Sequence, residues 1–304
     1  MKDRTEWLED RRKGVGGSDI AAIMGVSPWK TAFQVYQEKR KEVKDWSGNE
    51  ATDWGTRMEP TLRQFYSDTT GREVRLADKI LFHKDYPCLL ANLDGFTDDR
   101  RVVELKTSRT GKGWGEPGTN QVPDSYTLQV QHYMLVTGFP VADIVVSIGG
   151  ALPVLYEIPE DLELQGMIVD AASAFWQRVL DGDPPPPVTF SDAVARFGKS
   201  EAVGSLIANQ KVIKLVNDLR GIREQAKVLE AQEEEIKGKL IITLGESGDE
   251  LIDPEGNVLV TYKLSKGRVS FALKGFQKLH PELYKQFTIT GEASRRFLLK
   301  GEKS

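Results

Sequence analysis

The segment RVVELKTSRT, residues 101–110, is the basis of the fold prediction. Two valines and Leu105 predict a short buried strand, but Glu104 and Lys106 place opposite charges inside it. Because successive side chains of a strand point to opposite faces, Glu104 and Lys106 share one face while Leu105 enters the core. A solvated strand face with an ion pair would also explain these charges, since such pairs are common and contribute little. The rest of the chain therefore has to distinguish an ordinary ion pair from a functional site.

The overall composition is that of a soluble globular protein. The chain has 304 residues, of which 39% are hydrophobic and 28% are charged, enough for one large core or two modest ones. It contains no run of about 18 apolar residues and no apolar signal core near its start, so neither a membrane span nor secretion is expected. A single cysteine, Cys88, excludes an internal disulfide framework and fits a reducing cytoplasm.

Metal chemistry is restricted by the same composition. With three histidines and one cysteine, a zinc site of the usual ligand types is improbable. A catalytic metal would have to be held by oxygen ligands, which suits Mg²⁺, with Mn²⁺ as a substitute.

The net charge of −4 argues against a protein that coats nucleic acid, but the charges are unevenly distributed. Residues 224–257 hold ten acids and three bases, whereas residues 263–304 hold ten bases and three acids. The basic segment could face phosphates, or its charges could simply keep it soluble.

Residues 1–190 are predicted to form one α/β domain. Helices are expected from Ser18 or Asp19 to Met24, over 31–42, and in TDWGTRMEPTLRQFYSDTTG, YTLQVQHYMLVTG and 161–181. Strands are expected within REVRLADKILFH, LLANLDGFTD, RVVELKTS, VADIVVSIGG and LPVLYEIP. The segment DGDPPPPV is expected to close the domain as a stiff linker.

Residues 200–304 are predicted to form a smaller α+β region. Apolar residues there follow alternating three- and four-residue steps, interrupted by Glu233: Val212, Leu215, Leu219, Ile222, Ala226, Leu229, Ile236 and Leu240. This heptad pattern predicts a coiled-coil hairpin or a helix docked on a partner. A β-hairpin is expected in NVLVTYKLSKGRVSF, turning near Lys266 and Gly267, and a final helix from about Leu273 to Phe287.

Three carboxylates are expected to meet in the first domain. Asp94 precedes Glu104 by about ten residues, and the turn segment TDDRR between them predicts two antiparallel strands that bring both acids side by side. Glu59, on the preceding helix, could reach the same place. Clustered anions repel unless a cation lies between them, so the cluster is a candidate divalent-metal site. Lys106 could then orient or help deprotonate a water that attacks a phosphodiester.

The two acids Asp94 and Glu59, and four further candidate residues of the first domain, also have purely structural explanations. Asp94 could be a turn former before Gly95, Glu59 a solvated helix residue, and Gln129 and Tyr133 packing residues on one helix face. Trp29 and Lys30 could contact a base and a phosphate, or close a hydrophobic lid.

The order Asp, then Glu-x-Lys across a hairpin, resembles the core of the PD-(D/E)xK nuclease superfamily. Five blocks, GVGGSDIAAIMGVSPWKT, WGTRMEP, ANLDGF, VVELKTS and QVQHYMLVTG, follow the order and spacing of the YqaJ-type viral recombinases, relatives of phage lambda exonuclease. The resemblance covers residues 10 to about 190. It implies a nuclease fold with a central mixed sheet flanked by helices.

The resemblance also implies roles for individual residues. Asp94 and Glu104 would be the principal metal ligands, with the Leu105 carbonyl as a further oxygen, while Glu59 would hold a second ion or its water. Lys106 would position the attacking water. The family's Gln-x-x-x-Tyr pattern falls on Gln129 and Tyr133, so that Gln129 would steady Lys106 or a DNA phosphate. The pocket for a 5′ phosphate would use Arg12, Ser18 and Asn92, beside a glycine-rich helix start.

The function that the resemblance implies is a magnesium-dependent 5′-to-3′ exonuclease acting on double-stranded DNA ends. It would produce 3′ single strands for an annealing protein in phage or prophage recombination, in the cytoplasm of a bacterial host. A ring around DNA, a trimer in lambda-type enzymes, would let an acidic protein stay on its substrate. The alternatives are an endonuclease of the same superfamily and a non-catalytic DNA-end-binding or assembly module, with residues 200–304 binding DNA, a partner or another copy.

Overall fold

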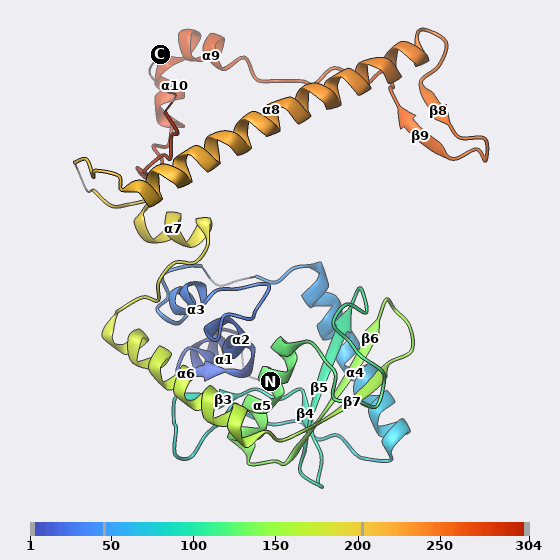
Figure 1. The fold of residues 1–304 in the computed structure, drawn as a ribbon, viewed down its shortest axis with the longest axis vertical. Helices are drawn as coiled ribbons and strands as arrows, with labels where there is room; N and C mark the ends of the chain where they lie inside the picture. Colours follow the sequence, from blue (N-terminus) through green and yellow to red (C-terminus); the bar gives the residue numbers. More distant parts are fainter. Residues whose placement is uncertain (1–3, 45–46, 202–203, 301–304) are drawn as a thin grey trace. The chain divides into compact units, whose positions relative to one another are not determined.

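The computed structural model of the chain describes residues 4–44, 47–201 and 204–300. It divides into two compact units, Met1–Arg196 and Phe197–Ser304, each described here by itself (Figure 1). The predicted linker segment DGDPPPPV is followed by one more helix, α7 (Phe190–Phe197), whose last residue lies beyond the boundary. Asp192 of this helix is buried and accepts a hydrogen bond from the Thr31 hydroxyl at 3.2 Å, which ties most of α7 to the first unit.

The described residues of the first unit form six further helices, which cover the helical segments that the sequence predicts. They are α1 (Arg4–Arg11), α2 (Gly17–Ile23), α3 (Ala32–Lys39), α4 (Glu50–Thr70), α5 (Asp124–Thr137) and α6 (Leu162–Asp181). Helix α4 starts where the Asn49 side chain accepts a hydrogen bond from the Thr52 N–H, and it ends at Gly71, whose φ of 70° suits a residue without a Cβ.

The main sheet is mixed, as predicted. Its four strands, β4 (Gly95–Phe96), β5 (Arg101–Ser108), β6 (Val141–Ile148) and β7 (Val154–Pro159), lie in the order β4-β5-β6-β7. β5 and β6 are parallel, and the other two pairs are antiparallel. The parallel pair is connected through α5, because parallel strands need a crossover of this kind.

A second, three-stranded sheet has the order β1-β3-β2. Its strands are short: β1 (Val15–Gly16), β2 (Leu81–Phe82) and β3 (Leu89–Ala91). In the segment REVRLADKILFH, which was predicted to be a strand, only Leu81–Phe82 forms one. Arg75 of this segment forms an isolated bridge with Phe96. In the rest of this segment Val74 packs against the core, whereas Leu76 is exposed.

Helices cover both faces of the main sheet (Figure 1). On one face, Leu62 and Tyr66 of α4 pack with Val103, Leu105 and Val145. On the other, apolar residues of α5 pack with alternate residues of β5, β6 and β7: Val130, Tyr133, Met134, Val102, Ile144, Val146, Tyr156 and Ile158. The strand β5 is thus buried on both sides, which is why charges within it need a specific explanation.

The second unit contains α8 (Gln210–Leu244), β8 (Glu250–Ile252), β9 (Val258–Thr261), α9 (Leu273–Leu279) and α10 (Pro281–Gln286). Two predictions about it are wrong in detail. The hairpin pairs β8 with β9 around Gly256, not two halves of residues 257–271 around Gly267. The final helix is broken at His280, since Pro281 starts a new helix and cannot continue the old one. No helix in the described part of the chain is long and apolar enough to span a membrane.

The start of α2 tests how closely the first unit is packed. A Cβ added at Gly17 would lie 2.5 Å from Tyr133 Cε1, so Gly17→Ala should lower the free energy of unfolding by about 1–3 kcal/mol. In Gly166→Ala, on α6, the added methyl has no neighbour within 4 Å, and stability should rise by up to about 1 kcal/mol. Urea unfolding of both variants measures the difference, and equal effects would contradict the packing described here.

Candidate active site

Two strands bring the acidic residues of the predicted site together. In the β4–β5 hairpin Gly95 pairs with Val103 and Phe96 with Val102, so the same register continued by one residue sets Asp94 opposite Glu104. The turn closes through Arg100, whose φ is 63°. The predicted hairpin is therefore present, and its register places both carboxylates at one end of the sheet.

Glu104 is a carboxylate buried inside the protein, with 1% of its surface exposed. Its Oε1 accepts hydrogen bonds from Lys106 Nζ at 2.5 Å and from Gln129 Nε2 at 2.7 Å. Its Oε2 is buried and has no hydrogen-bond partner within the described chain. Burial, together with the charge of Asp94, raises the pKa of Glu104 to about 8. The protein therefore supplies hydrogen bonds to one oxygen of this carboxylate and none to the other.

Lys106 supplies the positive charge on the same face of β5. Besides Glu104, its ammonium donates to Gln129 Oε1 at 3.1 Å and lies 4.9 Å from the centre of the Tyr126 ring. Burial alone would lower the pKa of Lys106, but the charges of Glu104 and Asp94 outweigh it and raise the pKa. Lys106 is therefore held as a cation with a fixed direction.

Asp94 and Glu59 share the same cavity of about 570 Å³. Asp94 Oδ2 accepts the Leu105 N–H at 3.0 Å, and burial raises the pKa of Asp94 although Lys106 opposes the shift. Glu59 Oε2 lies 3.6 Å from Arg63 Nη2, and burial followed by the charge of Asp94 raises the pKa of Glu59.

The three carboxylates predicted to hold divalent ions, with Glu59 at a second ion or its water, line one cavity. Among the described residues, no three His, Cys, Asp or Glu side chains form a group that could hold a metal ion. Each of the three acids has one partner inside the protein: Lys106 for Glu104 Oε1, the Leu105 N–H for Asp94 and Arg63 for Glu59.

The residues nevertheless fit a divalent cation held by fewer ligands. An unpartnered buried carboxylate oxygen on Glu104, next to a second carboxylate on Asp94, is costly without a cation, and hard oxygen ligands suit Mg²⁺ or Mn²⁺. The residues that would hold the ion are Glu104 and Asp94, with the carbonyl of Leu105, the next residue of β5, as the further oxygen that the resemblance implies.

Helix α5 fixes the orientation of this cluster. Gln129 Nε2 also contacts the Tyr133 hydroxyl at 3.1 Å, one helical turn further on. Gln129 thus contacts both Lys106, as the family resemblance implied, and Glu104, which was not predicted. Gln131 points elsewhere, donating to the Pro159 carbonyl at 2.7 Å.

The residues predicted to hold a 5′ phosphate are distributed differently from the prediction. Ser18 and Asn92 line the cavity of Glu104, but the arginine beside them is Arg11, whose Nη2 donates to Ser18 Oγ at 2.8 Å. Arg12 instead contacts Glu9 Oε1 at 2.9 Å and the Glu38 carbonyl at 3.4 Å. Of two adjacent arginines, the one that ends α1 faces the site.

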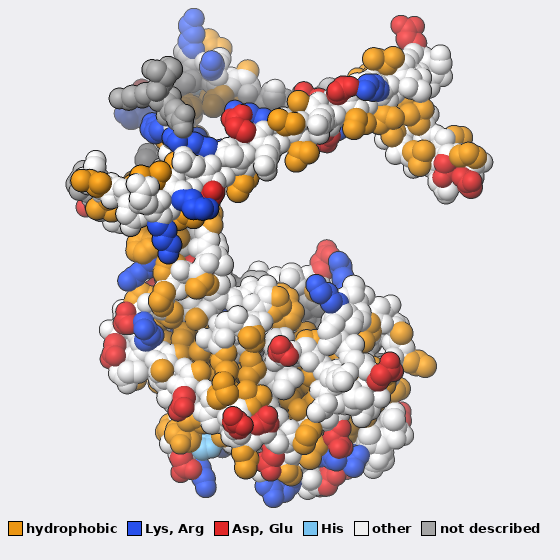
Figure 2. Space-filling view, in the orientation of Figure 1, with side chains coloured by type: hydrophobic (Ala, Val, Ile, Leu, Met, Phe, Trp, Pro, Cys, Tyr) orange, Lys and Arg blue, Asp and Glu red, His pale blue; other side chains and the backbone are white. Residues whose placement is uncertain are grey.

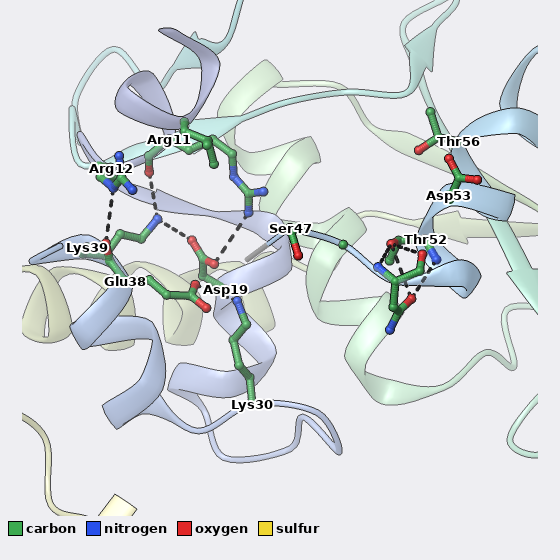
Figure 3. A pocket seen from close by; sticks show the side chains of 13 residues that line it. Arg11, Arg12, Asp19, Lys30, Glu38, Lys39, Ser47, Thr52, Asp53 and Thr56 are labelled. Carbon is green, nitrogen blue, oxygen red and sulfur yellow. Dashed lines mark hydrogen bonds and ion pairs between the residues drawn. The ribbon is translucent and has the colours of Figure 1, made fainter. Parts of the chain in front are cut away.

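Figure 3 shows a second cavity, of about 680 Å³. It shares Arg11, Thr52 and Thr56 with the first. Buried Asp19 lies there between Lys39, at 2.6 Å, and Arg11, at 3.9 Å. Although burial alone would raise it, the pKa of Asp19 is held well below its ordinary value by Lys39 and Arg11. This buried pair fixes α1, α2 and α3 to one another, so Arg11 is attached to a rigid support.

Two aromatic residues of the site were not assigned to it from the sequence. Tyr126 packs beneath Lys106, and its position three and seven residues before Gln129 and Tyr133 could have indicated a shared helix face. Trp29, 67% exposed, lies 6.0 Å from Tyr126 between ring centres and lines the cavity. No sequence signal distinguishes it from a residue of a hydrophobic lid.

The raised pKa of Glu104 predicts a pH effect on stability. Because its pKa is about 8 in the folded chain and 4.5 ordinarily, the folded protein binds more protons than the unfolded chain between these values. The free energy of unfolding should therefore fall as pH rises through this window, by at most about 1.4 kcal/mol per pH unit from this group. Denaturant unfolding in EDTA from pH 5 to 8 should show a steeper fall for the natural chain than for Glu104→Gln. Parallel curves would mean that Glu104 is not buried as described.

The matching family model and the most extensive match to a curated protein indicate the same family. A model described as YqaJ-like viral recombinase domain matches residues 6–140. The Bacillus subtilis (strain 168) protein named Uncharacterized protein YqaJ is 33% identical over 250 residues, which cover 78% of this chain and 77% of that protein. Protein D345L of African swine fever virus is 36% identical over 67 residues, 21% of this chain and 19% of that protein.

Among solved structures, an alkaline exonuclease from Laribacter hongkongensis matches 59% of this chain and 94% of its own, with 22% identity and a TM-score of 0.49.

Proposed function

We propose that this chain, which belongs to the YqaJ-like viral recombinase family, is a metal-dependent deoxyribonuclease. The observation that carries the proposal is the buried Glu104 carboxylate, with one oxygen bound by Lys106 and Gln129 and the other without a partner beside Asp94. A divalent cation held there would polarise the phosphodiester and stabilise charge on the leaving oxygen.

The protein's own residues would prepare the reaction. Lys106, held as a cation by Glu104 and oriented by Gln129, is placed to position the attacking water and to stabilise negative charge on the phosphate. Gln129 in turn is fixed by the Tyr133 hydroxyl, which limits the movement of all three polar groups. Glu59, in the same cavity, could hold a second ion or a water.

The finer proposal is a 5′-to-3′ exonuclease acting on double-stranded DNA ends. Arg11 and Ser18 offer a forked cation and a hydroxyl next to Glu104, and Asn92 lines the same cavity, a set of donors suited to a terminal phosphate. The product would be a 3′ single strand passed to an annealing protein in phage or prophage recombination, in the bacterial cytoplasm. A ring of several copies would keep the acidic chain on DNA.

Linear and closed circular duplex DNA, each with and without Mg²⁺, separate this proposal from its alternatives. Magnesium-dependent loss of the linear DNA alone is expected. Loss of both substrates would favour an endonuclease of the same superfamily, and loss of neither would favour a DNA-end-binding or assembly module. The last outcome contradicts the nuclease proposal altogether.

Two substitutions separate chemistry from metal binding. Lys106→Ala should lower the cleavage rate by roughly 10² or more while Mg²⁺ and DNA binding persist. Glu104→Ala should lower cleavage and also weaken Mg²⁺ binding measured by calorimetry. The exposed Lys84→Ala is the matched control and should behave as the natural chain does. Full activity of either site variant would remove the assignment.

The two arginines give a test of end recognition. Arg11→Ala should reduce the preference for a 5′-phosphorylated end over a 5′-hydroxyl end roughly tenfold or more, because its guanidinium lies on Ser18. Arg12→Ala should change the preference little, since Arg12 is directed to Glu9 and Glu38. The ratio of degradation rates for the two ends is the measurement. A loss confined to Arg12→Ala would reverse the assignment.

A further inference from the structure

The second unit leaves most of its apolar surface uncovered. Among the residues that the structure describes, Leu244 is the one buried apolar side chain of this unit. Its 35-residue helix α8 carries apolar side chains on the surface along its length (Figure 2). A helix of about five heptads with an exposed apolar stripe is stabilised mainly by a partner, because most helical stability comes from burial of that stripe.

The exposed stripe coincides with the heptad positions. Leu215, Ile222, Leu229 and Ile236 occupy successive d positions, and 58–64% of each is exposed. The a positions between them are Val212, Leu219, Ala226, Glu233 and Leu240, and the next d position is Thr243. A strict seven-residue repeat of this kind matches the seam of a coiled coil.

We infer that α8 pairs with α8 of a second copy of this chain, in antiparallel orientation. With Ala226 placed against the partner's Leu229, every other layer follows from the heptad. Moving outward, each a position faces a d position of the partner. The remaining layers are Val212 with the partner's Thr243, Leu215 with the partner's Leu240, Leu219 with the partner's Ile236, and Ile222 with the partner's Glu233. Because of the twofold symmetry the seam has five distinct layers, and four of them contain no charged side chain.

Charge complementarity supports this orientation and register. The positions flanking the seam set Asp218 beside the partner's Lys239, and Arg223 beside the partner's Glu230. Gln225 lies beside the partner's Gln232, and Val216 beside the partner's Lys237. The twofold symmetry repeats each pair, and no like charges meet at these positions. Asp218 and Lys239 also hold ion pairs within their own helix, with Lys214 at 2.7 Å and Glu235 at 2.6 Å.

Parallel pairing is disfavoured by Glu233. In a parallel dimer each a position faces itself, so Glu233 would oppose the partner's Glu233 inside the seam. In the antiparallel register the two Glu233 side chains lie in different layers, each with Lys237 at 2.5 Å on its own helix. A polar residue at one a position thus selects orientation and register.

An antiparallel pair has twofold symmetry, so it joins chains in even numbers. If the first units also assemble into rings, α8 would link one ring, or one chain, to another across this twofold axis. The seam therefore adds an interface that does not depend on the nuclease proposal.

Disulfide crosslinking of the full chain tests the orientation. Cys88→Ala provides a cysteine-free background, onto which Val212→Cys or Thr243→Cys is introduced. In the antiparallel pair these two positions face each other, so a disulfide should form after the two variants are mixed and allowed to exchange. Each variant alone should remain uncrosslinked. In a parallel pair the two positions would lie about 46 Å apart, beyond disulfide reach. Crosslinking of Val212→Cys with itself would overturn the antiparallel orientation.

Sedimentation of the full chain tests the interface itself. Leu229→Asp introduces a charge into the seam and should at least halve the mass of the natural assembly. Val228→Asp is the matched control, since Val228 is 57% exposed but lies outside the seam, and its assembly should be unchanged. Circular dichroism of both variants checks that the first unit stays folded. A natural chain of 34.0 kDa that sediments as a monomer, or equal effects of the two variants, would overturn the proposal.

A charge exchange tests the register. Asp218→Lys and Lys239→Asp should each weaken association about tenfold, and the double variant should recover it, because the two residues face each other across the pair. Failure of the double variant to recover would remove this register.

Discussion

Glu104 places a carboxylate in a strand that is covered on both faces, where an isolated negative charge would be strongly unfavourable. The ammonium of Lys106 and the amide of Gln129 compensate one of its oxygens, and nothing in the described chain compensates the other. A sheet optimised only for stability would put apolar residues here. The cost of the charge and its incomplete compensation support the proposal that a divalent cation binds here.

The surrounding fold keeps this cluster rigid. Helix α5 contributes Gln129 and Tyr133 on one face, and Tyr133 packs directly on Gly17 at the start of α2. The buried pair of Asp19 and Lys39 then connects α2 to α3 and leaves Arg11 at the edge of the cavity. A displacement at any of these contacts would be transmitted to the charged groups, because each side chain is held by the next.

Much of this arrangement follows from local sequence rules. The turn between Asp94 and Glu104 fixed the register of the hairpin, and strand alternation placed Glu104 and Lys106 on one face. What failed depended on tertiary detail. Arg11 and Arg12 are neighbours, and only the packing of α1 decides which faces Ser18. The sequence also carried no sign of the separate partners of two carboxylates, the Leu105 N–H for Asp94 and Arg63 for Glu59. The C-terminal hairpin formed around Gly256 because Asp253 and Asn257 close a turn there through their side chains.

The two units differ in how far they bury their apolar residues, and this difference bears on their roles. Every residue of the candidate active site, from Arg11 to Tyr133, belongs to the first unit, whose clusters of apolar side chains are buried within it. The second unit has a regular apolar seam on α8 but almost no core. Exposed positions tolerate polar residues freely, yet from Val212 to Leu240 every a and d position except Glu233 is apolar. The repeat is therefore evidence that the seam is covered when the protein acts.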